Sequence, residues 1–195
     1  MIFLAGATDV YGLSRLHDLF VSFMSGNTTS LGVAIGRGDT PRAVTAAVIV
    51  ALFVLGVALG TILAEFSERW QSVLVMGTVT VLLAAAAALP AAAIQIVVLA
   101  MGALNAAMNR IGVTGISLTY VTGALVKFGQ GLGRLLCGRG AADWSWTLQG
   151  VLWLCLLLGA VAGACAEGWF GAAQVWVLSA LALGLTISAV GLVVR

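Results

Sequence analysis

Two polar motifs interrupt an otherwise apolar chain and contain the residues that could contact a polar solute. The first is Phe-Met-Ser-Gly-Asn-Thr at residues 23–28, and the second is Thr-Tyr-Val-Thr-Gly at residues 119–123. Hydroxyl and amide groups are costly in a bilayer unless they line a cavity or contact protein groups. The motifs therefore predict a pore or binding site, with close helix packing as the simpler alternative. The candidate solute contacts in and after them are Ser25, Gly26, Asn27, Thr28, Thr119, Thr122, Gly123 and Lys127.

Two further polar residues lie in apolar segments at matching positions. Asp9 follows Gly6 by three residues, and Asn105 follows Gly102 by three residues. A carboxylate within a membrane segment is a functional candidate by default, although a short helix would place Asp9 near the interface. Asn105 is equally suited to hydrogen bonds that join two helices. We expect both residues to line the solute path, with Asp9 or Lys127 as the charge relay or coupling site.

The composition indicates which elements hold these residues. Of the 195 residues, 62% are hydrophobic and 8% are charged, and the mean hydropathy is +1.13. A soluble domain carries about a quarter charged residues. Eight apolar segments separated by short polar loops are present, and long apolar runs favour helices. The sequence predicts an all-α polytopic, multi-pass membrane protein with 6–8 membrane segments, whose second and sixth helices are broken at glycine.

Correspondences between the two halves indicate an internal duplication. Three anchors recur in the same order: Gly6 to Asp9 with Gly102 to Asn105, Gly26 and Gly32 with Gly123 and Gly129, and Leu55 to Gly60 with Leu158 to Gly163. We predict two fused membrane repeats, residues 1–90 and 91–195, in one integral membrane domain. The first copy has only five residues before its glycine, which predicts either a short half-helix or a start that removes part of that helix. Lysine and arginine positions favour parallel copies, whereas one re-entrant segment per copy would make them inverted.

These motifs also resemble those of a known family. Ala5-Gly-Ala-Thr-Asp9, Phe23-Met-Ser-Gly-Asn27, Asn105 with Arg110, and Thr119-Tyr-Val-Thr-Gly123 are similar to motifs of the YoaK-type family of small bacterial inner-membrane proteins of uncharacterised function. The resemblance implies a membrane protein with functional residues at these positions, and it implies no substrate. Ser25 stands where the family has threonine, and Leu104 where glutamine is common before Asn105.

Signatures of other function classes are missing from the sequence. The single histidine lies beside Asp18 in a short loop, and the three cysteines have no metal-site spacing. No catalytic motif, carboxylate cluster or nucleotide-binding fold pattern is present. The net charge of +2 is too small to indicate nucleic acid as a partner. We therefore expect no enzymatic activity, no cofactor and no metal site.

The sequence thus favours a transporter or channel for a small polar or charged solute, driven by gradients. The alternative is a non-transporting membrane scaffold that binds partners, and a membrane enzyme acting on lipid is a weaker alternative. Small-residue faces let helices approach closely. The faces of Gly56, Gly60, Gly159 and Gly163 therefore predict either packing within the protein or a homo-oligomer formed through them.

Overall fold

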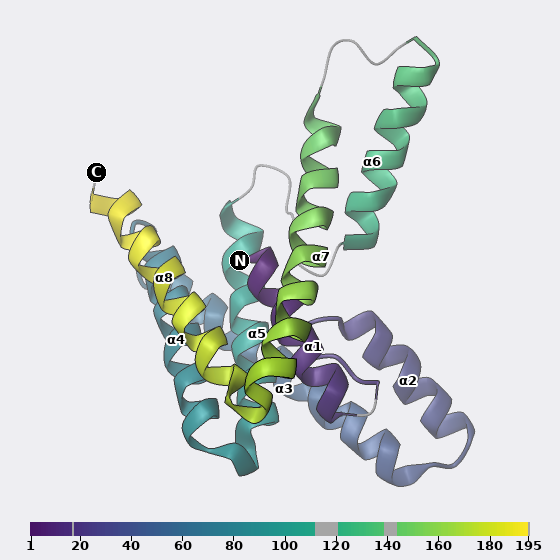
Figure 1. Cartoon of the computed structure of the whole chain (residues 1–195), viewed down its shortest axis with the longest axis vertical. Coiled ribbons are helices and arrows are strands. Elements are labelled where there is room, and N and C mark those ends of the chain that lie inside the picture. The colour runs from purple at the N-terminus through teal and green to yellow at the C-terminus, as the bar shows by residue number, and fades with distance from the viewer. Residues whose placement is uncertain (17, 112–120, 139–143, 195) are drawn as a thin grey trace.

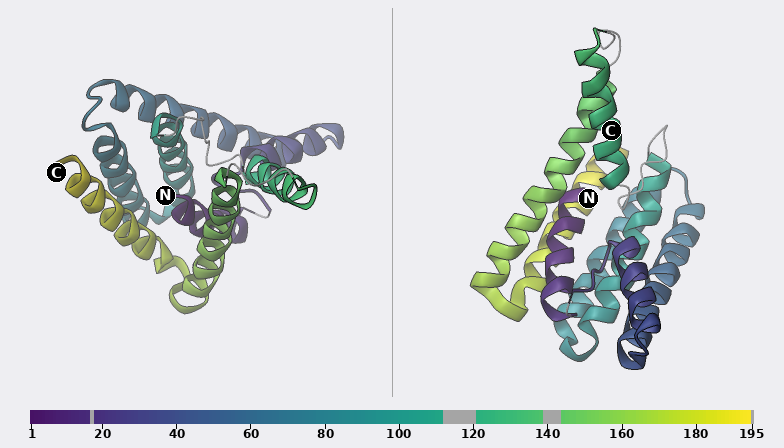
Figure 2. Two further views of the ribbon diagram at one scale, coloured as in Figure 1. Left: turned by 90° about the horizontal axis from the view of Figure 1, so that it is seen from above. Right: turned by 90° about the vertical axis from the view of Figure 1, so that its right-hand side faces the viewer.

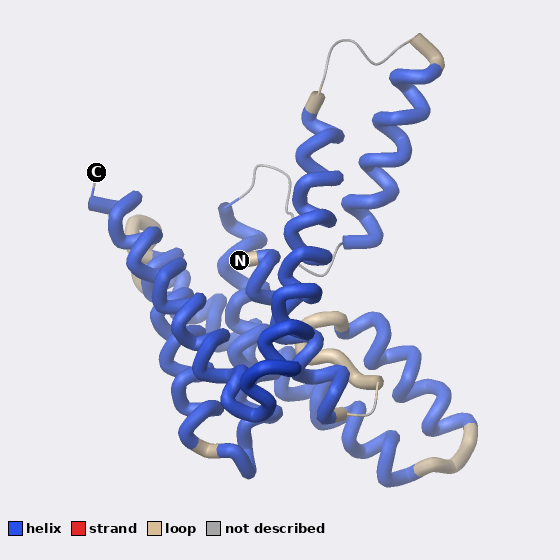
Figure 3. Tube along the Cα trace, in the orientation of Figure 1, coloured by secondary structure: helices blue, strands red, loops and turns tan. Residues whose placement is uncertain are grey.

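The computed structural model describes residues 1–16, 18–111, 121–138 and 144–194. Within these ranges the chain is helical and has no strand, which confirms the predicted all-α class (Figures 1 and 3). Two short 3-10 helices, Pro90–Ala92 and Gly171–Ala173, precede the fifth and last α-helices. The α-helices are α1 Ile2–Arg15, α2 Met24–Gly36, α3 Thr40–Glu65, α4 Gln71–Ala88, α5 Ala93–Ile111, α6 Val121–Leu136, α7 Ser145–Phe170 and α8 Gln174–Val194.

Three of the described stretches are long and apolar enough to cross a membrane. They are α3, α4 and the stretch Ser145–Val194 that contains α7 and α8. The 26 residues of α3 extend about 39 Å, which exceeds a hydrocarbon core of about 30 Å. Most residues in these stretches are not buried by the protein itself, so their apolar surfaces suit contact with lipid. The predicted number of 6–8 segments stays a prediction.

Local sequence explains where several helices begin and end. The Asp39 carboxylate accepts a hydrogen bond from the Arg42 backbone N–H at 3.2 Å, and Pro41 lies in the first turn, so α3 begins with a strong N-cap. Just after α2 and α6, Gly38 and Gly138 have φ of 69° and 70°. Glycine adopts this left-handed conformation without a steric cost, which allows the chain to leave a helix sharply.

Taken in chain order, the four α-helices of residues 1–90 run opposite to the four of residues 91–195. α1 and α2 run in the same direction, followed by alternating α3 and α4, and α5 and α6 run together in the opposite direction (Figures 1 and 2). The parallel arrangement favoured by the charges is therefore wrong for these helices. The charge argument assumed that every segment crosses, whereas α1 and α2 descend together and are joined by a non-helical return.

Four glycines let helices from the two halves touch backbone to backbone. A Cβ at Gly60 of α3 would lie 2.6 Å from the Ala103 carbonyl oxygen of α5. A Cβ at Gly163 of α7 would lie 2.7 Å from the Ala7 carbonyl oxygen of α1. Gly56 and Gly159 meet the same two partner helices one turn earlier. These faces pack within the chain, as one of the two alternatives predicts, and a homo-oligomer involving Gly56, Gly60, Gly159 and Gly163 stays a prediction.

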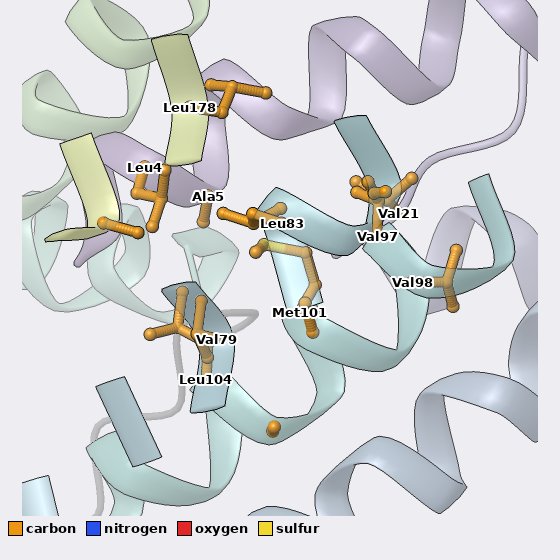
Figure 4. Packing of buried hydrophobic residues seen from close by; sticks show 14 of the residues in the cluster. Leu4, Ala5, Val21, Val79, Leu83, Val97, Val98, Met101, Leu104 and Leu178 are labelled. Atoms are coloured by element: carbon orange, nitrogen blue, oxygen red, sulfur yellow. The ribbon is translucent and has the colours of Figure 1, made fainter. Parts of the chain in front are cut away.

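The buried core lies where α1, α4, α5 and α8 meet. Figure 4 shows Leu4 of α1, Leu83 of α4 and Leu178 of α8 around Met101 of α5. The Thr8 hydroxyl is fully buried here, and it donates either to the Leu4 carbonyl oxygen at 2.9 Å or to the Met101 sulfur at 3.0 Å. Lipid is as apolar as these side chains, so close packing and such hydrogen bonds provide the stability.

The glycine contacts predict a site-specific loss of stability. In Gly56→Ala, the added methyl group would overlap the Leu99 carbonyl oxygen of α5, and we expect a loss of about 1–3 kcal/mol through overpacking. The matched control is Gly184→Ala in α8, where no atom lies within 4 Å of the added carbon. Thermal unfolding in detergent should show a lowered melting temperature for Gly56→Ala alone. Equal melting temperatures would contradict the close approach of α3 and α5.

Candidate functional site

The helix break lies between α1 and α2 rather than within α2. α1 ends at Arg15, α2 begins at Met24, and the described residues between them are not helical. Asp18 has a φ of 72°, a left-handed conformation that aspartate tolerates better than most residues. We call residues 16–23 the return segment, with residue 17 outside the described part.

The prediction of helices broken at glycine is wrong for both described positions. Gly26 lies in the first turn of α2, and Gly123 is the third residue of α6, and both helices continue past them. At Gly26 the missing side chain makes room, because a Cβ would lie 2.7 Å from the Phe23 ring. Gly26 is therefore needed for its small size in a regular helix.

The carboxylate of Asp9 binds the backbone of the return segment. Its Oδ1 accepts hydrogen bonds from the Val21 N–H at 3.0 Å and the Ser22 N–H at 2.7 Å. Its Oδ2 accepts one from the Ser22 hydroxyl at 2.5 Å. A non-helical segment within a membrane protein must have its backbone groups bonded by the protein. Asp9 supplies two of these bonds from α1.

Asn27 holds the same segment from the other side. Its Oδ1 accepts from the Phe20 N–H at 2.8 Å, and its Nδ2 donates to the Phe20 carbonyl oxygen at 2.7 Å. The side chain of Asn27 is fully buried. The amide of Asn27 thus binds both backbone groups of Phe20, as a neighbouring strand would do in a β-sheet. Asp9 and Asn27 together fix the conformation of the return segment, and we call them the clamp.

A cavity of about 370 Å³ lies beside the clamp. Its lining comes from α1, the return segment, α6 and α7, so it brings together elements from both halves of the chain. The polar groups in this lining are Asp9, Ser22 and Thr122. Its apolar lining residues are Gly6, Val10, Leu13, Phe20, Phe23, Val121, Leu125, Leu156 and Ala160. A mostly apolar cavity with a few polar groups in its lining is typical of small-molecule sites.

Two of the predicted site residues, Asp9 and Thr122, line this cavity. Asn27 contacts the return segment, and Gly26 accommodates Phe23, so these two residues contribute indirectly. Thr119 lies outside the described residues.

The other predicted residues are not brought to the cavity lining. Ser25 and Thr28 are exposed on α2, and the Thr28 hydroxyl donates to the Met24 carbonyl oxygen of its own helix at 2.8 Å. Asn105 is buried in α5, where its Nδ2 donates to the Met101 carbonyl oxygen at 3.1 Å. Gly123 lies in α6 next to Thr122 without lining the cavity.

Lys127 is exposed on α6 and does not face Asp9 across the cavity. It follows the lining residue Leu125 by two positions, which is about 200° around the helix. The two candidates for the charge relay, Asp9 and Lys127, are therefore not brought together at this cavity. The cation nearest in sequence to Asp9 is Arg15, and its Nη1 lies 3.2 Å from Glu167 Oε1. The Arg15 guanidinium also lies 4.1 Å from the centre of the Tyr11 ring.

Several lining residues were missed by the sequence analysis. Phe20 and Phe23 form an edge-to-face pair with ring centres 5.3 Å apart and planes at 88°. Their position beside the polar run of residues 22–29 was the available signal. Leu156 and Ala160 of α7 line the cavity with apolar surface only, and their side chains carry no pattern that separates them from lipid-facing positions.

Comparison with known proteins identifies the family. The model of a family described as "Protein of unknown function (DUF1275)" matches residues 1–188. A similar relative is the UPF0700 transmembrane protein RA0705 of Rhizobium meliloti (strain 1021), with 41% identity over 190 residues, or 96% of this chain and 82% of the relative. The UPF0700 transmembrane protein YoaK of Bacillus subtilis (strain 168) is 26% identical over 200 residues, or 95% and 89% of the two chains. No solved structure matches.

The chain therefore belongs to the DUF1275 family, and the resemblance to YoaK-type proteins is confirmed. Both relatives are named as transmembrane proteins, and the chain has long apolar helices. The protein is accordingly a membrane protein.

The clamp predicts a specific effect of removing Asn27. In Asn27→Ala, the N–H and carbonyl groups of Phe20 lose their partners, and each unsatisfied buried group costs about 1–3 kcal/mol. We expect a lower melting temperature and faster hydrogen exchange at Leu19 to Phe23. The control is Thr28→Ala, whose hydroxyl bonds only within α2, and which should change neither quantity. Unchanged exchange in Asn27→Ala would show that the clamp does not order this segment.

Proposed function

We propose that this member of the family is a multi-pass protein of the inner (plasma) membrane that transports a small polar or charged solute. The observation that carries the proposal is the return segment, which is non-helical, held by the clamp and adjacent to a cavity shared by the two halves. Irregular backbone at membrane depth is tolerated where protein buries it or where it lines a cavity. Transport proteins place their solute sites at such breaks.

The arrangement of the helices supports two inverted repeats, residues 1–90 and 91–195. α1 packs parallel to α7, and α3 packs parallel to α5, so each half contributes its first helix to the other. α2 lies on α3 just as α6 lies on α7, and α4 pairs with α8. Inverted repeats of this kind give transporters two similar states that open to opposite sides.

The cavity lies where the two halves would move against each other. Asp9 and the return segment belong to the first half, whereas Thr122, Leu125 and Leu156 belong to the second. α6 packs chiefly on α7, so displacement of α6 along α7 changes the cavity without disrupting the glycine contacts of α3 with α5 and of α7 with α1. Solute gradients supply the energy in this proposal, and the chain has no catalytic step, no cofactor and no nucleic-acid partner. Its partners are the lipid bilayer and the solute.

A second candidate function is a scaffold that binds another membrane protein. The supporting observation is the exposed face of α2 formed by Ser25, Thr29, Gly32 and Gly36, where no atom contacts the added carbon at either glycine. The continuous helices through Gly26 and Gly123 also favour this candidate, because they remove both glycine breaks expected of a pore. A scaffold needs no solute movement, so a flux measurement separates the two candidates.

Filling the cavity should block transport. Leu125 lines the cavity and Leu132 lies two turns further along the same face of α6, and their exposed fractions are 41% and 42%. We expect Leu125→Trp to occupy part of the cavity and abolish flux, whereas Leu132→Trp should retain it. Proteoliposome swelling, followed by light scattering in iso-osmotic solutions of a panel of small solutes, measures flux without knowledge of the substrate.

The outcomes of this swelling assay distinguish the candidates. Transport predicts that at least one solute enters faster with the wild-type protein and with Leu132→Trp than with Leu125→Trp. If no solute enters faster than in protein-free liposomes, the transport proposal fails and the scaffold is favoured. Circular dichroism and gel filtration of both variants check that the inserted tryptophan has not prevented folding.

The inverted arrangement predicts the sidedness of two corresponding loop positions. Arg37 follows α2 and Cys137 follows α6, each directly before a glycine of positive φ. In a background of Cys155→Ala and Cys165→Ala, Cys137 should react with an impermeant maleimide from one side of the membrane. Arg37→Cys, combined with Cys137→Ser, should react from the other side. Labelling of both positions from the same side would establish parallel copies.

A further inference from the structure

We infer that the cavity binds an amphiphilic organic cation, a protonated amine with a small apolar body. The inference rests on the proposed function and names the substrate class for the same cavity. Three observations carry it: an acid without a cationic partner among the described lining residues, two aromatic rings in the same lining, and a surface that is apolar apart from Asp9, Ser22 and Thr122.

Among the described residues of the lining, Asp9 is the only one with a charged side chain. Its hydrogen-bond partners are the Val21 and Ser22 N–H groups and the Ser22 hydroxyl, the Phe23 N–H also interacts with it, and all of these groups are neutral. Arg15 pairs with Glu167 at the end of α1, and Lys127 lies on another face of α6. A partly desolvated carboxylate is stabilised most by a cation. A positively charged ligand would supply the cationic partner that Asp9 lacks among the described lining residues.

The geometry at Asp9 leaves room for one more donor. Each carboxylate oxygen accepts about two hydrogen bonds. Oδ1 already accepts two, from Val21 and Ser22, whereas Oδ2 accepts one, from the Ser22 hydroxyl. An ammonium N–H can therefore bind Oδ2 without displacing the clamp.

The aromatic pair suits the same ligand. Phe20 and Phe23 line the cavity with Asp9, and the edge-to-face geometry presents one ring face beside the other ring's edge. Ammonium groups bind aromatic faces through the ring quadrupole, most strongly when desolvated. The combination of a carboxylate and phenyl rings thus favours an amine over a neutral alcohol of equal size.

The remaining lining residues determine the polarity and size of the uncharged part of the ligand. Val10, Leu13, Leu125, Leu156 and Ala160 offer only apolar contacts. A sugar or a zwitterion would leave several polar groups without partners here, which costs about 1–3 kcal/mol for each group. The volume of about 370 Å³ is at the lower end of ligand cavities. These features fit one ammonium group on a single small hydrocarbon body.

Three nearly isosteric probes test the inference on the intact protein in detergent at pH 7. Phenethylamine is cationic, 2-phenylethanol is neutral and phenylacetate is anionic, and isothermal titration calorimetry measures each Kd. We expect phenethylamine to bind at least about tenfold more tightly than 2-phenylethanol, as a gain of roughly 1.4 kcal/mol from the charge requires. Phenylacetate should bind most weakly, because it faces the carboxylate.

The key variant is Asp9→Asn. The amide oxygen of asparagine can still accept both backbone N–H bonds, and Asn105 already occupies the corresponding position of the second half. We expect the preference for phenethylamine over 2-phenylethanol to fall to about twofold or less while the melting temperature stays close to that of the wild type. The matched control is Asp39→Asn, an equivalent loss of charge at the N-cap of α3, which should keep the full preference.

A second variant guards against misfolding of the first. Phe23→Leu keeps the acid and removes one ring, so amine binding should weaken about threefold or more, by the roughly 0.5–1 kcal/mol of a cation–π contact. Binding of 2-phenylethanol should change less. Equal affinity of the wild type for amine and alcohol, absence of binding by all three probes, or a full amine preference in folded Asp9→Asn would each overturn the inference.

These results are separable from the test of transport. If Leu125→Trp blocks swelling but the wild type shows no amine preference, the cavity is a solute path and the substrate class is wrong. If phenethylamine binds selectively but no panel solute and no amine crosses the liposome membrane, the binding site stands and the transport proposal fails.

Discussion

The structure depends on one constraint, which is that backbone N–H and carbonyl groups cannot be left unbonded within a membrane protein. A helix satisfies this constraint by itself, but the return segment between α1 and α2 does not. Asp9 accepts from two of its N–H groups, and Asn27 binds both backbone groups of Phe20. The chain can therefore leave helical geometry between α1 and α2 because these two side chains bind the freed backbone groups. The cavity exists because the return segment, held by these two side chains, forms part of its lining.

The glycine contacts are the second requirement, and they act on a larger scale. Helix association in lipid gains little from hydrophobic burial, so it requires close approach and good packing. Gly56 and Gly60 provide this for α3 on α5, and Gly159 and Gly163 provide it for α7 on α1. Because each contact joins an element of one half to an element of the other, neither half has a core of its own. The clamp and the cavity are thus supported by a frame that both halves build together.

Sequence reasoning predicted the helical membrane class and identified both clamp residues as unusual, because polar groups in apolar segments stand out by composition alone. It did not predict what they contact. Asn27 and Asp9 were expected to face a solute, yet most of their hydrogen-bonding capacity serves the backbone of residues 20–22. The break was placed at Gly26 because glycine permits irregular backbone, whereas Gly26 is helical and makes room for Phe23. Glycine can either permit irregular backbone or make room for a neighbouring side chain. Here only the position of the Phe23 ring shows that Gly26 has the second role.

Asp9 has two roles, because it binds the return segment and also lines the cavity. The same carboxylate that holds Val21 and Ser22 also lines the cavity. A cation that binds Oδ2 shares that oxygen with the Ser22 hydroxyl and weakens its hydrogen bond, so ligand binding and the conformation of the return segment are not independent. Two equilibria that share one group are coupled, and the coupling acts in both directions. Phe20 and Phe23 lie on the same segment and on the same cavity, so any movement of the segment also changes the aromatic part of the site. The acid that makes the irregular segment possible is therefore also the group through which a bound solute could alter it.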